Sequence, residues 1–239
     1  MMKICVLGSG SKGNATYIDI DGTKILVDCG FSKKEVNKRL ATIGRSIDDI
    51  QHIFITHNHG DHLAPWLVKS GDSRVRSICC APYIHSYSKN AFKVEKFLLS
   101  HDSESHGYTF TNKQGQKVAI LMDTGCVPEE VLPHLFDCSA ILIETNYDVD
   151  MLAVGKYPIE LLERIASDHG HLRSECAAEV IEMVAGPKLQ YVCCMHLSSS
   201  NNHPDLARFC IDSVLQGEDF RPEVIVSDQR KPTKLMVVM

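Results

Sequence analysis

Residues 57–62 combine three imidazoles and one carboxylate in one short segment, as His57, His59, Asp61 and His62 of the string HNHGDH. The apolar run IFI precedes them and is typical of a strand, and a loop that leaves a strand can turn all four side chains inward. Imidazole and carboxylate groups suit zinc, manganese or iron. The spacing therefore predicts a metal site, although two metal ions would need more ligands than these four. The alternative is a loop of solvated polar residues.

The composition is that of one globular domain. The chain has 239 residues, of which 44% are hydrophobic, and this is enough to bury one large core. We expect a single domain over residues 1–239. No apolar run approaches the roughly 20 residues that span a bilayer, and the start of the chain lacks the pattern of an export signal. We therefore expect a cytoplasmic protein that does not bind membranes.

The cysteines indicate the redox environment of the protein, and the net charge limits how it could bind nucleic acid. The ten cysteines are scattered, two pairs of them are adjacent, and no CxxC motif occurs, which favours reduced thiols in the core. The net charge of −5 argues against a chain that coats nucleic acid by bulk positive charge. Any polyanion must therefore be bound locally.

The elements that must position the metal site alternate between strands and helices. The first 30 residues indicate three strands in antiparallel succession, with a turn at Asp21-Gly22. Residues 32–44 carry apolar side chains on one helical face, between a possible cap at Ser32 and a stop at Gly44. Further helices are expected over 158–170 and 174–185 and from about Pro204, and strands near LQYVCCM, VIV and LMVV. This interrupted alternation predicts mixed sheets flanked by helices, with the chemistry on loops at strand ends.

The HxHxDH pattern after a strand resembles the signature of the metallo-beta-lactamase superfamily, and further segments follow in the order of that family. His101 precedes Gly107-Tyr108, Asp123 ends VAILMD, and His196 ends YVCCMH. The resemblance covers nearly the whole chain. It implies an α+β fold, an αββα sandwich of two mixed β-sheets flanked by helices. It also matches Asp28, in KILVDCG, to a position that is usually structural.

The same resemblance implies a site for two divalent metal ions and divides its ligands between them. His57, His59 and His101 would bind one ion, Asp61, His62 and His196 the other, and Asp123 both. By the family spacing, His101 is the ligand and His106 is not. Zinc is the expected metal, with manganese or iron as alternatives, and a hydroxide between the ions would be the nucleophile.

Two positions argue against other activities of the superfamily. Oxygen-reducing relatives carry a carboxylate where this chain has His59, so a redox role is not expected. Many true β-lactamases use cysteine where this chain has Asp123, and they are exported. Antibiotic hydrolysis is therefore not expected either.

Four further segments resemble the WalJ/YycJ-like branch of the superfamily, whose members are regarded as DNA exonucleases. They are GSGSKGNATYI, ETNYDVDMLAVGKYP, SDHGHLRSECAAE and HLSSSNN. The segment around His171 resembles the place where relatives that cleave nucleic acid keep a histidine that protonates the leaving oxygen, which implies a general acid. The alternative for His171 is a helix cap or a solvent-facing side chain. Asp61 and His171 are the residues that we expect to act in catalysis.

Basic residues gather in two segments. Lys33, Lys34, Lys38 and Arg39 fall on the helix expected over 32–44. Lys89, Lys93 and Lys96 fall on another expected helix, amid Tyr83, Tyr87 and Phe92. Either segment could follow phosphates or stack bases, and the alternative is a charged, solvated helix face.

The sequence predicts a two-metal phosphodiesterase that acts on nucleic acid, with DNA favoured over RNA and an exonuclease favoured. One alternative is a thioesterase of the glyoxalase II kind, which shares the ligand set but needs a basic and aromatic C-terminal region that is not seen here. Another is a metal-stabilised binding protein that regulates a partner without turnover, although an inert scaffold has little need for so many inward ligands. The oligomeric state is left open.

Overall fold

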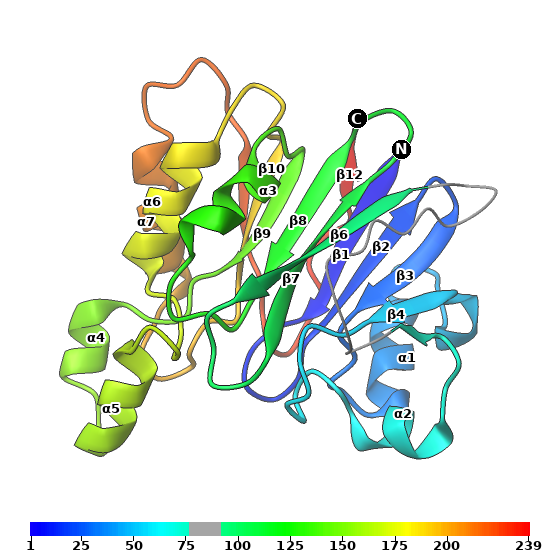
Figure 1. The fold of residues 1–239 in the computed structure, drawn as a ribbon, viewed down its shortest axis with the longest axis horizontal. Coiled ribbons are helices and arrows are strands. Elements are labelled where there is room, and N and C mark those ends of the chain that lie inside the picture. Colours follow the sequence, from blue (N-terminus) through cyan, green and yellow to red (C-terminus); the bar gives the residue numbers. More distant parts are fainter. Residues whose placement is uncertain (77–91) are drawn as a thin grey trace.

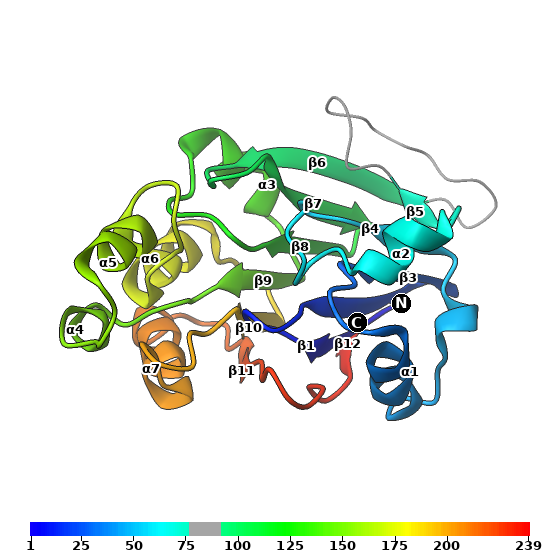
Figure 2. The same cartoon turned by 90° about the horizontal axis from the view of Figure 1, so that it is seen from below.

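The computed structural model describes residues 1–76 and 92–239, in which two six-stranded β-sheets lie face to face (Figures 1 and 2). The first sheet has the order β12 (Met236–Val238), β1 (Met2–Gly8), β2 (Ala15–Ile20), β3 (Thr23–Val27), β4 (His52–Phe54) and β5 (Val75–Arg76). The second has the order β11 (Glu223–Val226), β10 (Tyr191–Met195), β9 (Ala140–Glu144), β8 (Lys117–Leu121), β7 (Ser105–Thr111) and β6 (Lys93–Leu99).

Both sheets mix parallel and antiparallel neighbours. Strands β1, β2 and β3 are antiparallel in succession, as expected, whereas β3, β4 and β5 are parallel. In the second sheet, β8, β9, β10 and β11 are parallel, whereas β6, β7 and β8 are antiparallel in succession. The prediction of two mixed sheets is confirmed.

The strands are apolar on both faces because each sheet is covered on both sides. In β1, Ile4 and Val6 join the layer between the sheets, where they share a core with Phe110 of the second sheet. The alternate residues Cys5 and Leu7 join a second core on the other face of β1. A shift of β1 by one residue would exchange the two layers, so this alternation helps to fix the register.

Helices cover the outer faces of the sheets and complete the predicted αββα sandwich. Helices α1 (Lys33–Ala41) and α2 (Pro65–Ser70) pack on the first sheet. Helices α3 (Leu132–Leu135), α6 (Ser174–Val184) and α7 (Pro204–Val214) pack on the second. Helices α4 (Val149–Ala153) and α5 (Ile159–Ala166) lie at one end of the molecule, beyond α6 and α7 (Figure 1), and 3-10 turns occur at Ile47–Asp49 and Glu129–Val131. Among the described residues, no helix has the length and apolarity needed to cross a membrane.

The loops that carry the predicted site residues leave the carboxyl ends of strands. Asp28 follows β3, residues 57–62 follow β4, His101 follows β6, Asp123 follows β8, and His196 follows β10. Strand β3 is parallel to β4. In the second sheet, β6 and β8 are both antiparallel to β7, and β8 and β10 are both parallel to β9. Because carboxyl ends of strands with one direction meet at one edge of a sheet, residues distant in sequence come together there.

Helix α1 begins where the sequence predicts, but one of its basic residues is structural. The hydroxyl of Ser32 accepts a hydrogen bond from the backbone amide of Glu35 at 3.3 Å and caps the helix. Arg39 is buried, and its guanidinium donates to the Glu35 carboxylate and to the carbonyl oxygens of Leu7 and Gln229. Arg39 therefore fixes the position of α1 and is not free to bind phosphate.

The prediction of a helix around Lys93 and Lys96 is wrong. Both residues lie in strand β6, which pairs along its whole length with β7. The ladder of hydrogen bonds to β7 and the burial of alternate apolar residues determine the structure here, and a spacing of three between lysines does not exclude a strand. Tyr83, Tyr87 and Lys89 lie outside the described residues.

Candidate metal centre

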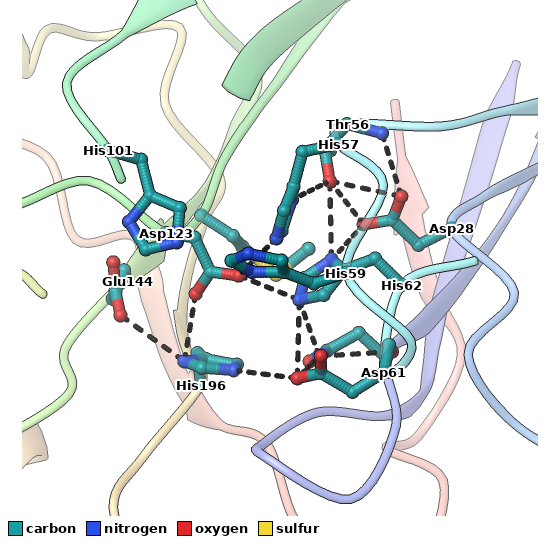
Figure 3. A network of polar contacts seen from close by, with 12 residues as sticks. Asp28, Thr56, His57, His59, Asp61, His62, His101, Asp123, Glu144 and His196 are labelled. Carbon is teal, nitrogen blue, oxygen red and sulfur yellow. Dashed lines mark hydrogen bonds and ion pairs between the residues drawn. The ribbon is translucent and has the colours of Figure 1, made fainter. Parts of the chain in front are cut away.

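Side chains from both sheets converge where these loops meet (Figure 3). Two of the four sets of side chains whose potential ligand atoms lie within 4.8 Å of one another are His57, His59 and His101, and Asp61, His62 and His196. Each of these two sets combines two residues of the 57–62 loop with one residue that follows a strand of the second sheet. The structure thus brings the predicted residues together in the two groups expected from the sequence.

Asp123 lies between the two sets. Its Oδ2 atom is 3.3 Å from Nε2 of His57 and 2.7 Å from Nε2 of His62, and its Oδ1 atom is 3.1 Å from Nδ1 of His196. Burial alone would raise the pKa of Asp123, but the charges of His196 and His62 outweigh it and hold this pKa well below its ordinary value. A carboxylate in this position can share its two oxygen atoms between two cations.

Two buried ring nitrogens show that the cluster suits metal ions. Nε2 of His57 and Nε2 of His196 make no hydrogen bond to any described residue, although Asp123 lies 3.3 Å from the first and Asp61 lies 3.8 Å from the second. Buried polar atoms in folded proteins are nearly always paired, so such atoms indicate a missing partner. Burial and the charge of His62 lower the pKa of His57 to about 3, which keeps its ring neutral and able to donate an electron pair. The cluster is of the kind that binds divalent metal ions.

Asp28 orients the ring of His62 through a hydrogen bond to its Nδ1 atom. Its Oδ2 atom accepts hydrogen bonds from Nδ1 of His62 at 2.7 Å and from the hydroxyl of Thr56 at 2.9 Å, and all three residues are buried. Burial opposes protonation of His62, but the carboxylates of Asp123 and Asp28 outweigh it and raise the pKa of His62 to about 10. A metal ion at Nε2 would take the place of the proton that these carboxylates stabilise, while Nδ1 stays bonded to Asp28, which is the usual arrangement for a ligating histidine.

His101 and His106 have different surroundings. Nδ1 of His101 donates to the carbonyl oxygen of Gly170 at 3.0 Å, which leaves Nε2 for a metal ion beside His57 and His59. His106 belongs to none of the candidate ligand groups within the described residues, and its Nε2 lies 3.5 Å from the exposed carboxylate of Glu104. The positions of the two rings agree with the choice of His101 over His106.

The glycine-rich loop between β1 and β2 forms one rim of the cluster. The hydroxyl of Ser9 accepts a hydrogen bond from the amide of His196 at 2.9 Å. Nδ2 of Asn14 lies 2.8 Å from Nε2 of His62, and its backbone amide donates to the carbonyl oxygen of Asp61 at 2.7 Å. The loop therefore holds ligand-bearing segments of both sheets in place.

Comparisons with known proteins identify the family. The model of the metallo-beta-lactamase superfamily matches residues 8–118. The chain is 32% identical to the exodeoxyribonuclease YycJ of Bacillus anthracis, over 98% of each chain. It is 30% identical to the exodeoxyribonuclease WalJ of Streptococcus pneumoniae, over 91% of this chain and 89% of that one. This chain belongs to the metallo-beta-lactamase superfamily.

The WalJ/YycJ-like branch predicted from the sequence is also confirmed by these two relatives. Among solved structures, the metallo-beta-lactamase fold protein YhfI from Bacillus subtilis has a TM-score of 0.71 at 15% identity, over 97% of this chain and 98% of that one. At this identity the match shows a shared fold. The metallo-beta-lactamase fold predicted from the sequence is thus confirmed.

Glu144 is a site residue that the sequence analysis missed, and it lies beyond residue 118, where the match to the metallo-beta-lactamase model ends. It ends strand β9 and is fully buried. Its Oε1 atom accepts a hydrogen bond from Nδ1 of His171 at 2.7 Å and lies 3.2 Å from Nδ1 of His196, and its Oε2 atom accepts from the amide of Thr124 at 2.9 Å. The available signal was a carboxylate at the end of an apolar run, AILIE, as in VAILMD.

His171 lies beside the two ligand sets. It forms a further group with Asp123, Glu144 and His196 whose atoms are close enough to hold a metal ion, but its Nδ1 is bonded to Glu144. Burial lowers the pKa of His171, yet the carboxylates of Glu144 and Asp123 outweigh it and raise this pKa to about 9. With Nδ1 bonded to Glu144, a protonated ring would have the proton on Nε2 to donate.

A cavity of about 180 Å³ opens onto the cluster. His101, His171 and His196 line it, together with Ser11 of the glycine-rich rim and residues of α5. Because His171 lines this cavity beside His101 and His196, a substrate can reach His171 through it.

Proposed function

We propose that the protein is a two-metal phosphodiesterase that removes nucleotides from the ends of DNA. The observation that carries the proposal is the Glu144–His171 pair beside the metal cluster. Cleavage of a nucleic acid diester expels a strongly basic alkoxide that needs a proton, whereas cleavage of a thioester expels a weakly basic thiolate. A protonated imidazole at this place therefore favours a phosphodiester over the thioester of a glyoxalase II-like enzyme.

We assign seven ligands to two cations. One cation would be held by His57, His59 and His101 and the other by Asp61, His62 and His196, and Asp123, which lies between the two sets, would be shared. Zinc suits a site this rich in imidazole, with manganese and iron as the alternatives. When bound, two divalent cations ionise a water molecule near neutral pH and neutralise charge on the phosphate.

Two residues of the chain have further roles in the reaction, one at the leaving group and one at the attacking water. His171 donates the proton on Nε2 to the leaving oxygen, while its Nδ1 stays bonded to Glu144 and the negative carboxylate stabilises the charged ring. The side chain of Asp61 is 27% exposed, compared with 3% for Asp123. We therefore propose that Asp61 is the carboxylate that orients the attacking water.

We also propose that the substrate is DNA and that the protein is cytoplasmic. Both full-length relatives are named exodeoxyribonucleases, which favours DNA over RNA. The cysteines that the structure describes are free, and burial raises the pKa of thiols such as Cys29 and Cys138 to about 12. Unpaired, unreactive thiols suit a reducing compartment.

The proposal is tested with a panel of substrates. Metal-loaded protein is incubated with end-labelled single- and double-stranded DNA and RNA, and separately with an acyl-glutathione. We expect mononucleotides to appear first from DNA, with slower release from RNA and no hydrolysis of the thioester. Thioester hydrolysis without nucleotide release would support the glyoxalase II alternative, and no turnover of any substrate would support the regulatory one.

A further inference from the structure

One wall of the cavity at the metal centre is apolar and belongs to no part of the proposed catalytic machinery. Tyr157, Leu161 and Ile165, which we call the apolar wall, line the same cavity as His101 and His171. The wall comes from α5 and from the residue two positions before it. A substrate whose phosphate reaches the histidines therefore also contacts this wall.

Helix α5 has an apolar face that the described part of the protein buries only in part. The helix carries Ile159, Leu161, Leu162 and Ile165, yet none of its residues is fully buried. Both ribbon views show α4 and α5 standing apart from the two sheets (Figures 1 and 2). A surface helix normally packs its apolar face on a core, so an apolar face left open to a cavity is suited to a ligand.

The apolar wall is fixed relative to the proposed acid. The amide of His171 donates to the carbonyl oxygen of Ile165 at 3.0 Å, so the end of α5 is bonded directly to the backbone of His171. Gly170 packs so closely on Arg164 and Ile165 that a Cβ atom there would overlap their carbonyl oxygens. Arg164 also forms an ion pair with Asp102, next to His101. A group bound on the wall thus has a defined distance to the site of proton transfer.

We infer that the apolar wall is a subsite for the nucleoside next to the scissile phosphate, with the base stacked on Tyr157 and packed against Leu161 and Ile165. This inference rests on the proposed phosphodiesterase activity and adds the recognition of the nucleoside to it. Aromatic and aliphatic side chains bind any base through its flat face, so the subsite accepts DNA ends without sequence preference. The polar groups of Ser11 and Ser198 in the same cavity suit the sugar and phosphate.

The test compares two diesters with the same leaving group. Thymidine 5′-(4-nitrophenyl phosphate) carries a nucleoside, and methyl 4-nitrophenyl phosphate does not. We define the nucleoside preference as the ratio of their kcat/KM values. We expect the unaltered protein to prefer the nucleoside ester and Tyr157→Ala to lower that preference roughly tenfold, the order of effect of removing one stacked ring. Turnover of the methyl ester should change little.

Matched variants and a binding measurement separate stacking from damage to the fold. Tyr157→Phe keeps the ring and should keep the preference, and Leu161→Ala should lower it by a smaller factor. Phe209→Ala removes a 67% exposed ring from α7 and should have no effect. Calorimetry should show the same loss of affinity for thymidine 5′-monophosphate in Tyr157→Ala as the kinetics.

The outcomes also separate this inference from the proposed function. An unaltered protein that degrades DNA but shows no nucleoside preference, or a Tyr157→Ala variant that keeps it, would overturn the subsite and leave the exonuclease intact. An unaltered protein that cleaves neither diester nor DNA would overturn both.

Discussion

At the scale of single residues, the Glu144–His171 pair determines whether a poor leaving group can depart. His171→Ala should retain its metal ions and lose roughly two to four powers of ten in turnover on DNA. It should be far less impaired on bis(4-nitrophenyl) phosphate, because that diester expels a phenolate that needs little protonation. His169→Ala is the control, since its exposed ring contacts Ser100 outside the cluster. Equal losses on both substrates, or loss of metal, would rule out the acid role.

The pH dependence of turnover tests the same pair. The acid must be protonated, so kcat on DNA should fall as the pH rises through the pKa of His171. Burial lowers this pKa and the carboxylates of Glu144 and Asp123 raise it to about 9, so removing the charge of Glu144 should lower it. We therefore expect Glu144→Gln to move the alkaline limb of the pH–rate profile to lower pH, with metal content measured in parallel. A limb that stays in place would show that Glu144 does not control the acid.

Site residues that lie in a short motif could be predicted from the sequence, whereas isolated site residues could not. The 57–62 segment predicts metal ligands because four ligating side chains within six residues rarely have another purpose. The signal for Glu144, a carboxylate at the end of an apolar strand, is too weak to predict a role, because no sequence spacing connects it with a partner. Its role appears only when parallel β9 and β10 bring it beside His196.

At the scale of elements, turns after strands aim the side chains into the site. Asp28 directly follows β3 and His196 directly follows β10, whereas one residue separates Asp123 from β8. All three residues have positive φ angles, which are 59° for Asp28, 55° for His196 and 52° for Asp123. Residues other than glycine rarely adopt this conformation, and when they do they cluster at functional sites. The sequence carries no signal for it, so the direction of these side chains could not be predicted.

A glycine substitution tests how closely two of these loops must approach. A Cβ atom on Gly30 would overlap the backbone carbonyl group of Asp61, whereas a Cβ atom on Gly60 would meet no atom within 4 Å. Gly30→Ala should therefore displace the ligand loop, weaken metal binding and destabilise the protein by roughly 1–3 kcal/mol. Gly60→Ala, in the ligand loop itself, should do neither. Elemental analysis and denaturant unfolding measure both effects, and equal behaviour of the two variants would contradict the close approach.

Elements with strong periodic patterns were predicted well, and those fixed by tertiary contacts were not. The antiparallel start and the helices after Ser32 and near 174–185 follow from local apolar spacing and caps. Strand β6 was predicted as a helix, because only its pairing with β7 decides its structure. The single-domain organisation of residues 1–239 stays a prediction.

At the scale of the whole molecule, the proposed metal ions connect the two sheets. Each ligand set takes two residues from the loop after β4 in the first sheet and one from the second sheet, His101 or His196. Metal ions that bind only the folded chain stabilise it, by about 2.7 kcal/mol per site at 100 times Kd. Removal of both ions by chelation should therefore lower the Tm by roughly 10–20 °C in calorimetry. An unchanged Tm after verified metal removal would show that the ions do not link the sheets.

The central claim is that the protein removes nucleotides from DNA ends at this cluster. The most direct measurement compares linear DNA with covalently closed circular DNA of the same sequence, using metal-loaded protein and an Asp123→Asn variant. We expect the protein to degrade the linear DNA to mononucleotides and to leave the circle intact, and we expect Asp123→Asn to degrade neither. Cleavage of the closed circle, or undiminished digestion by Asp123→Asn, would contradict it.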